Sequence, residues 1–273
     1  MAIPALPNRK AGRVETLREA ARLKRESMQP DLRRERWIPP DKYGRPQDPT
    51  SWATPGDGFW GRFFINMWDA WGDPYWWPGA NAWECASGAI LVQNTTWNSA
   101  SKTILSLCEA GYNDAESLLA APVETVEQTI RSVGYYRAKT RKLRELAAWW
   151  IANSADTGGV DDISDDDLRA QLLNIWGIGP ETADDILVYC FGRPWFVVDA
   201  YAIRLRQRLT GSDLKLSYDQ LQQEVHAELP RDYMLLHQLH GLVDKLCGYV
   251  CQKKPSCEVC PILELCEYGK GRQ

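Results

Sequence analysis

A short glycine-rich turn between two apolar segments carries the strongest chemical signal in this chain. The segment Leu172–Trp176 is followed by Gly177-Ile178-Gly179 and then by Pro180, which suits the first position of a new helix. The two glycines leave backbone N–H groups uncovered beside a helix N-terminus, where the helix dipole favours an anion. We predict that this helix-hairpin-helix binds a DNA phosphate, because a grip on the phosphate backbone requires no particular base sequence.

A carboxylate follows the second hairpin helix, since Asp199 comes eighteen residues after Glu181. The hairpin and this aspartate together resemble the endonuclease III superfamily of base-excision glycosylases, and the similarity covers roughly residues 69–268. The resemblance implies that Asp199 is the family's essential aspartate. It would activate a water molecule or stabilise an oxocarbenium-like sugar, as carboxylates do in glycoside hydrolysis.

The residue at position 181 bears on the type of reaction. Bifunctional members of the family carry lysine where this chain has Glu181. A lysine amine can attack C1′ and form a Schiff base that permits strand cleavage, whereas a glutamate cannot. The resemblance therefore implies a monofunctional DNA glycosylase without AP-lyase activity. Glu181 is also accounted for as an acid in the first turn of a helix, where the macrodipole favours it.

Four cysteines near the C-terminus have the spacing of a metal centre. Cys251, Cys257, Cys260 and Cys266 fall within sixteen residues, separated by five, two and five residues. Four thiolates can bind zinc or an iron–sulfur cluster. The spacing is similar to the [4Fe-4S] loop of endonuclease III relatives, whose first gap is one residue longer. We expect a [4Fe-4S] cluster with a mainly structural role.

Aromatic residues bear on the damaged base. The strings Trp76-Trp77-Pro78 and Gln93-Asn94-Thr95-Thr96-Trp97 resemble the 3-methyladenine glycosylase branch of the superfamily. N-methylated purines carry positive charge, so electron-rich rings attract a flipped base of this kind. By this resemblance the substrate pocket consists of Trp77, Pro78, Trp97 and Glu181. Tryptophans are also common core residues, so packing is the alternative role for these rings.

Further residues are expected to contact DNA. The resemblance implies that Gln93 fills the space of the flipped base and that Tyr135, in Gly134-Tyr135-Tyr136, wedges into the opposite strand. The complete predicted DNA-binding set is Gln93, Tyr135, Gly177, Gly179, Thr182, Lys139, Lys253 and Lys254. Lys253 and Lys254 are equally consistent with ordinary solvated charges.

Composition suits a globular, intracellular protein. The chain has 273 residues, of which 44% are hydrophobic, and a net charge of −4. No signal peptide or membrane-spanning run is evident. The net charge does not itself favour DNA, but Arg131–Arg144 holds six basic and no acidic residues, and residues 1–36 hold ten basic and five acidic residues. We expect a cytoplasmic, nucleoid-associated monomer that binds double-stranded DNA with a damaged base and uses no nucleotide cofactor.

Hydrophobic periodicity predicts an all-α fold. Helices are expected near residues 12–35, 62–71, 81–93, 99–110, 114–120, 123–132, 137–153, 181–191, 199–210, 217–228 and 232–250, with a first hairpin helix capped at Ser164. The family resemblance implies two helical lobes. We expect a six-helix barrel over residues 74–194, with the hairpin near 164–191, and an iron–sulfur lobe from residues 48–73 and 195–273. Residues 1–47 form a basic N-terminal extension. The DNA groove would lie between the lobes.

Two other functions remain open. One is an endonuclease III-like glycosylase for oxidised pyrimidines or mismatched bases, with weak or no lyase activity. The departure of His240-Gly241-Leu242 from the lysine-containing motif of methyl-purine relatives leaves the preferred base undecided. The other is a DNA-binding scaffold without catalysis, which Asp199 argues against because binding alone needs no carboxylate facing DNA.

Overall fold

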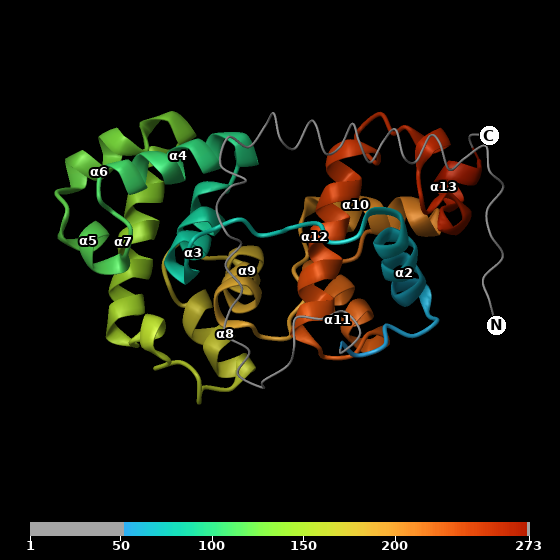
Figure 1. The fold of residues 1–273 in the computed structure, drawn as a ribbon, viewed down its shortest axis with the longest axis horizontal. Helices are drawn as coiled ribbons and strands as arrows, with labels where there is room; N and C mark the ends of the chain where they lie inside the picture. The colour runs from blue at the N-terminus through green and yellow to red at the C-terminus, as the bar shows by residue number, and fades with distance from the viewer. Residues whose placement is uncertain (1–51, 272–273) are drawn as a thin grey trace. The chain divides into compact units, whose positions relative to one another are not determined.

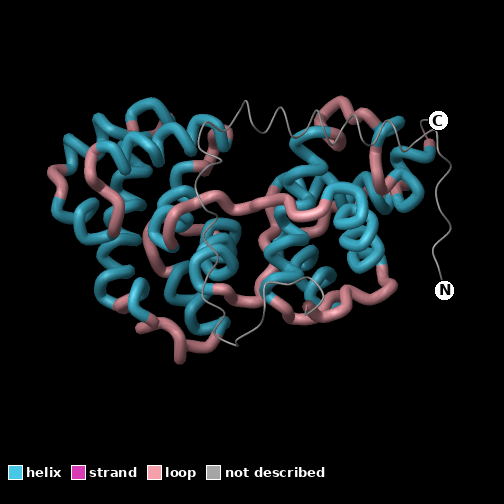
Figure 2. Tube along the Cα trace, in the orientation of Figure 1, coloured by secondary structure: helices cyan, strands magenta, loops and turns pink. Residues whose placement is uncertain are grey.

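The computed structural model describes residues 52–271, which contain twelve α-helices and no β-strand (Figures 1 and 2). The all-α prediction is therefore confirmed for this part of the chain. The predicted helix over residues 12–35 and the basic extension over residues 1–47 lie outside the described residues. No helix between residues 52 and 271 is both long enough and apolar enough to cross a lipid bilayer.

The described residues form two compact units. The continuous unit consists of residues 77–197, and the split unit joins residues 52–76 to residues 198–271. These boundaries lie three residues after those expected from the sequence. Within residues 52–271 the chain enters the continuous unit once and leaves it once.

The continuous unit contains seven helices among the described residues. They are α3 (Ala82–Leu91), α4 (Trp97–Glu109), α5 (Ala115–Ala120), α6 (Val123–Thr129), α7 (Tyr136–Ala152), α8 (Asp165–Leu173) and α9 (Pro180–Phe191), with 3₁₀ turns η2 (Arg131–Val133) and η3 (Ala155–Thr157). The single helix expected over residues 123–132 is wrong in detail, because it divides into α6 and η2. Every residue of α3 is buried, and α3 packs against α4, α7 and α9. It is therefore the central helix of this unit (Figure 1).

The two hairpin helices begin at residues that favour a helix start. The hydroxyl of Ser164 accepts a hydrogen bond from the N–H of Asp167 at 3.2 Å, which caps α8 as predicted. Pro180 is the first residue of α9, and Gly179 is its N-cap without a side-chain cap. The helix ends at Gly192, whose φ of +62° is a left-handed conformation that glycine adopts without strain.

The split unit is built around a long buried helix. Its helices are α2 (Phe59–Trp71), α10 (Ala200–Thr210), α11 (Tyr218–Glu228), α12 (Tyr233–Tyr249) and α13 (Glu267–Lys270), with 3₁₀ turns η4 (Cys257–Val259) and η5 (Leu263–Leu265). α12 is buried along most of its length and packs against α2 and α10. Asp232 caps α12 by accepting hydrogen bonds from the N–H groups of Met234 and Leu235. This packing fixes the start of α10, where Asp199 lies.

Candidate functional site

The glycines of the hairpin turn are exposed to solvent, and its isoleucines are buried. Ile175 and Ile178 are 8% and 6% exposed, and the N–H of Ile178 bonds to the carbonyl of Ile175 at 3.1 Å. Gly177 has a φ of +85°, so this turn requires a residue that tolerates the left-handed region. Gly177 and Gly179 are both exposed. The first turn of α9 therefore offers uncapped N–H groups and the positive end of a helix dipole to an anion.

Glu181 and Thr182 occupy the first turn of α9 with opposite exposure. The side chain of Glu181 is exposed, whereas Thr182 is 5% exposed. The hydroxyl of Thr182 accepts a hydrogen bond from Nε2 of Gln93 at 2.8 Å. Gln93 lies in the turn after α3, so this bond joins two residues that the sequence predicts to contact DNA.

Tyr135 lies at an exposed, strained turn. It is 74% exposed and has a φ of +49°, directly after Gly134 with a φ of +74°. A non-glycine residue in the left-handed region costs about 1–2 kcal/mol. Strain combined with exposure of an aromatic ring is typical of residues that act on a partner rather than on the fold. The geometry is compatible with the wedge role, which stays a prediction.

Lys139 is buried, whereas a contact with a DNA phosphate requires an exposed ammonium. It is 2% exposed, and its ammonium donates to the carbonyls of Leu91 at 2.8 Å and Val133 at 3.4 Å. Burial, with a smaller contribution from the neighbouring Lys142, lowers the pKa of Lys139 to about 8. The prediction that Lys139 contacts DNA is therefore not supported, because its donors hold the ends of α3 and η2. The buried position could not be read from the sequence, which shows only a run of basic residues.

The predicted pocket aromatics differ in exposure. Trp77 is 3% exposed and packs edge-to-face on Trp97 with ring centroids 4.9 Å apart, and at a tilt on Tyr189 at 5.3 Å. Trp97 is half-buried as the first residue of α4, and Pro78 is also half-buried. In this arrangement Trp77 contributes to the core of the continuous unit. A pocket role for these three residues stays a prediction.

Two further side chains on the hairpin face were not singled out from the sequence. Trp176 is 43% exposed, and the guanidinium of Arg141 lies over its ring at 3.8 Å from the centroid. Lys142 donates to Oε1 of Gln93 at 2.5 Å. The basic run around α7 was the available signal, but it did not distinguish Lys142 from Lys139.

Asp199 is the N-cap of α10 in the split unit. Its Oδ1 accepts a hydrogen bond from the N–H of Ala202 at 2.7 Å, and the residue is half-buried. Val197 and Val198, the two valines before it, are 1% exposed. The buried valines and the cap together hold the carboxylate at the positive end of the α10 dipole.

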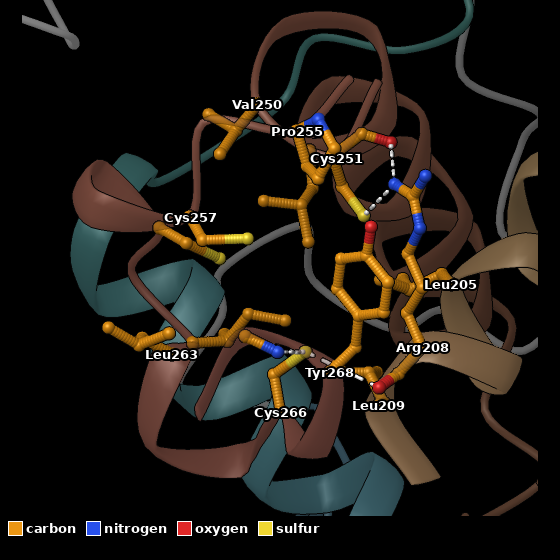
Figure 3. Close-up of a pocket in the computed structure, with 14 residues that line it drawn as sticks. Leu205, Arg208, Leu209, Val250, Cys251, Pro255, Cys257, Leu263, Cys266 and Tyr268 are labelled. Carbon is orange, nitrogen blue, oxygen red and sulfur yellow. Dashed lines mark hydrogen bonds between the residues drawn. The ribbon is translucent and has the colours of Figure 1, made fainter. Parts of the chain in front are cut away.

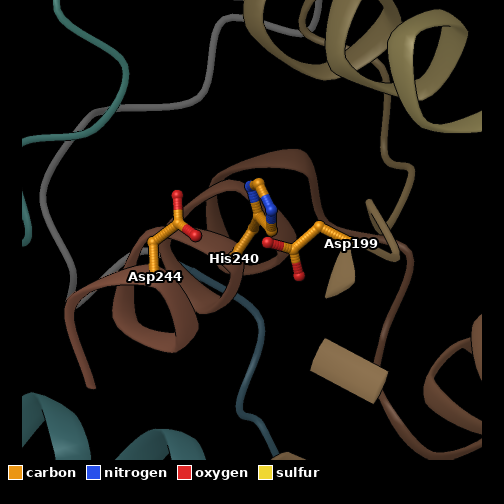
Figure 4. A group of neighbouring side chains, drawn as sticks. All are labelled: Asp199, His240 and Asp244. Atoms are coloured by element: carbon orange, nitrogen blue, oxygen red, sulfur yellow. The ribbon is translucent and has the colours of Figure 1, made fainter. Parts of the chain in front are cut away.

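His240 and Asp244 of α12 lie beside Asp199. One ligand atom from each of the three side chains falls within 4.8 Å of the others (Figure 4). His240 is 4% exposed, and burial lowers its pKa while the Asp199 carboxylate opposes that change. The buried imidazole gives Asp199 a polar neighbour. The motif His240-Gly241 did not reveal this contact in the sequence.

The four cysteines expected to bind a metal line one cavity in the split unit. Cys251, Cys257, Cys260 and Cys266 all contribute to its wall, and the sulfurs of the three that are labelled point toward its interior (Figure 3). Cys247, the other cysteine near this loop, is not part of the wall. Arg208 Nη1 donates to Cys251 Sγ at 3.1 Å, and the N–H of Gly269 donates to Cys266 Sγ at 3.3 Å. Donors aimed at sulfur stabilise thiolates, so the residues fit a four-thiolate metal centre.

Lys253 and Lys254 lie on the exposed loop that begins at Cys251. Both side chains are exposed. Arg208 donates to the carbonyls of Gln252 at 2.6 Å and Lys253 at 3.1 Å. The loop is thus fixed by its backbone while its lysines face solvent, and their contact with DNA stays a prediction.

Comparisons with known proteins agree with this geometry. Residues 87–231 match the family described as "HhH-GPD superfamily base excision DNA repair protein". A Methanocaldococcus jannaschii protein named as a putative DNA repair glycosylase is 34% identical over 200 residues, covering 72% of this chain and 91% of that protein. Endonuclease III of Bacillus subtilis is 31% identical over 163 residues, covering 59% of this chain and 70% of that protein.

A solved structure extends the similarity to the fold. The structure of a trapped endonuclease III–DNA covalent intermediate matches with a TM-score of 0.66 and 27% identity, covering 77% of this chain and 96% of that chain. The superfamily expected from the hairpin and Asp199 is confirmed. The chain belongs to the HhH-GPD superfamily of base excision DNA repair proteins, and it is a DNA glycosylase of that family.

Proposed function

We propose that this glycosylase is monofunctional and releases an alkylated purine of the 3-methyladenine type from double-stranded DNA. The observation that carries the proposal is the exposed glutamate at the start of α9. By the family resemblance Glu181 takes the position of the lysine in bifunctional relatives, and it lies in the first turn of α9 beside the uncapped N–H groups of the hairpin. A carboxylate there cannot form a Schiff base, so hydrolysis rather than elimination follows.

In the proposed reaction the Asp199 carboxylate accepts a proton from water as the water oxygen forms a bond to C1′. The N-glycosidic bond breaks, and its electron pair leaves with the base. An N-methylated purine is cationic before cleavage and departs as a neutral molecule, so it needs no proton from a general acid. The proton on Asp199 then returns to solvent. An exposed anionic Glu181 would attract such a cationic base, which supports this substrate class.

We also propose that the cavity of Cys251, Cys257, Cys260 and Cys266 holds a [4Fe-4S] cluster. Such a cluster supplies four metal–thiolate bonds that cross-link the C-terminal loop. Arg208 and Gly269 would donate hydrogen bonds to its ligand sulfurs. Lys253 and Lys254 would then be held on a fixed loop, where they can contact the phosphate backbone.

The test is excision from labelled duplexes that each contain one lesion, with every sample read with and without alkali. Release of 3-methyladenine or 7-methylguanine, with strand breaks only after alkali, is expected. Breaks without alkali, or activity on thymine glycol alone, would overturn the proposal in favour of an endonuclease III-like activity. The Asp199→Asn variant is expected to bind the damaged duplex and to lose excision. Equal excision by that variant would exclude the role given to Asp199.

A further inference from the structure

The amide of Gln93 is held between two partners that fix its orientation. Lys142 Nζ donates to Oε1 at 2.5 Å, and Nε2 donates to Thr182 Oγ1 at 2.8 Å. A lysine ammonium has only donors, so the oxygen of the amide must face Lys142 and the nitrogen must face Thr182. Gln93 therefore has one defined orientation before DNA arrives.

Lys142 also lies against the hairpin. A Cβ added to Gly177 would fall 2.5 to 2.9 Å from the aliphatic carbons of Lys142. The side chain thus crosses the bare backbone of the phosphate-binding turn on its way to Gln93. A side chain at position 177 would have to displace the Lys142 stem from this path.

The charge of Lys142 is not neutralised by a direct ion pair within the described residues. No carboxylate of residues 52–271 forms an ion pair with it, although Lys142 is half-buried. Burial lowers its pKa. An incoming phosphate at the exposed glycine N–H groups would stabilise the half-buried ammonium of Lys142, because the phosphate supplies a negative charge to pair with it.

The turn that carries Gln93 is anchored from the same helix. Lys139, three residues before Lys142 on α7, donates to the carbonyl of Leu91 at the end of α3. Asn94, directly after Gln93, has a φ of +55°. Two lysines of α7 therefore hold this strained turn. Lys139 bonds to the backbone of Leu91, and Lys142 bonds to the side chain of Gln93.

We propose that Lys142 is a positioning residue that holds Gln93 ready for insertion and couples that insertion to phosphate binding at the hairpin. The inference rests on the proposed role of Gln93 in filling the space of the flipped base. Lys142 acts through Gln93 and through the phosphate. It takes no part in breaking the glycosidic bond.

The experiment measures binding of the full-length protein to a duplex containing a tetrahydrofuran abasic analogue opposite 2-aminopurine, and to the same duplex without the lesion. The variants are Lys142→Met, Gln93→Ala and their double mutant. Methionine keeps the apolar stem over Gly177 but removes the charge and the donor. Lys102→Met is the matched control, because Lys102 is an exposed lysine on α4 of the same unit. Lys142→Arg tests rescue by a conservative change.

Lys142→Met is expected to lower the preference for the abasic duplex about tenfold, as loss of a charge-assisted hydrogen bond would. Lys142→Met should also reduce the change in 2-aminopurine fluorescence that accompanies binding. The double mutant should prefer the abasic duplex no less than Gln93→Ala alone does, because the two residues act in one chain of contacts. Lys102→Met should leave the preference unchanged, and Lys142→Arg should restore part of it.

Equal loss of affinity for damaged and undamaged DNA, additive with Gln93→Ala, would overturn the inference. That result would make Lys142 a plain phosphate contact, whose loss weakens binding to all duplexes about equally and lowers the salt dependence of binding. An unchanged lesion preference in Gln93→Ala would overturn it too, by removing the role of Gln93. The assay uses no base lesion, so failure to excise alkylated purines would refute the proposed substrate and leave this inference standing.

Discussion

At the scale of single residues, position 181 is proposed to separate hydrolysis from strand cleavage. Glu181 is exposed in the first turn of α9, so a lysine side chain can be accommodated there without rearranging the core. Glu181→Lys is expected to add AP-lyase activity, because the amine can form a Schiff base with an abasic sugar. The measurement is borohydride trapping of the protein on an abasic duplex, together with strand breaks in the absence of alkali.

The control for this change is Glu181→Gln, which removes the charge without adding an amine. It should give no trapped complex. Trapping of the unmodified protein as efficiently as of Glu181→Lys would show that another amine of this chain reaches C1′. The monofunctional assignment would then be wrong.

Lys139 gives the fold a pH dependence whose sign follows from its burial. Its pKa is lowered from 10.5 to about 8. Between these values the unfolded chain binds more protons than the folded chain, so the contribution of Lys139 to stability rises with pH. The unfolding free energy of the natural protein relative to Lys139→Met should therefore increase from about pH 8 to pH 10.5. Chemical denaturation across that range measures it.

Lys102→Met is again the matched control, because it removes an exposed lysine of the same unit. A flat difference between the natural protein and Lys139→Met would indicate that the Lys139 ammonium keeps its proton throughout the range. Its two carbonyl contacts would then stabilise the charged form enough to offset burial.

At the scale of elements, the two hairpin glycines are expected to respond differently to alanine. Gly177 has a φ of +85° and faces the stem of Lys142, whereas Gly179 is extended and has no atom within 4 Å of an added Cβ. Gly177→Ala should lower the unfolding free energy by about 1–2 kcal/mol. Gly179→Ala should change it by less than about 0.5 kcal/mol. Thermal or urea unfolding distinguishes these outcomes.

DNA binding by the same pair tests the phosphate site. Both alanines place a methyl group near the N–H groups of the turn, so both should weaken binding to undamaged duplex. A Gly179→Ala variant with normal stability and normal affinity would place the phosphate elsewhere. This comparison keeps a binding defect apart from a folding defect.

The helices themselves follow from local signals. Ser164, Asp199, Ser217 and Asp232 each cap the helix that follows them, and Pro180 starts α9. Caps and apolar periodicity act within one or two turns of chain, so they can be read without knowing the fold. The division of residues 123–132 into α6 and η2 is the exception. Its sequence has no proline or glycine at the break.

At the scale of the whole molecule, the C-terminal segment is expected to depend on its cysteines. Residues 250–271 contain short 3₁₀ turns and the four-residue helix α13, and four cysteines line their cavity. Cys260→Ser is expected to lower the iron content and the thermal midpoint by several degrees, because metal binding contributes to folding. Iron analysis, visible absorbance and thermal unfolding measure the effect.

Cys108→Ser is the matched control, since Cys108 is a half-buried cysteine on α4 of the continuous unit. It should keep the iron content. Purified protein that is colourless and holds stoichiometric zinc would contradict the cluster assignment. The four-thiolate site and the fold would be unaffected by that result.

The sequence by itself determined the features that depend on near neighbours in the chain. The hairpin motif, the cysteine spacing within sixteen residues, the helix caps and the superfamily all rest on short stretches of residues. Each of these features is encoded by contacts or ligand sets that close within a few turns of chain. The all-α fold could therefore be predicted from the order of the amino acids alone.

Only the tertiary structure decided which side chains are buried and which meet across the fold. Lys139 and Lys142 look alike in sequence, yet one holds Leu91 from 48 residues away and the other holds Gln93 from 49 residues away. Trp77 and Trp176 differ in the same way, one at 3% and the other at 43% exposure. Burial depends on how α3, α7 and α9 pack together, and that packing follows from long-range apolar contacts that no local pattern specifies.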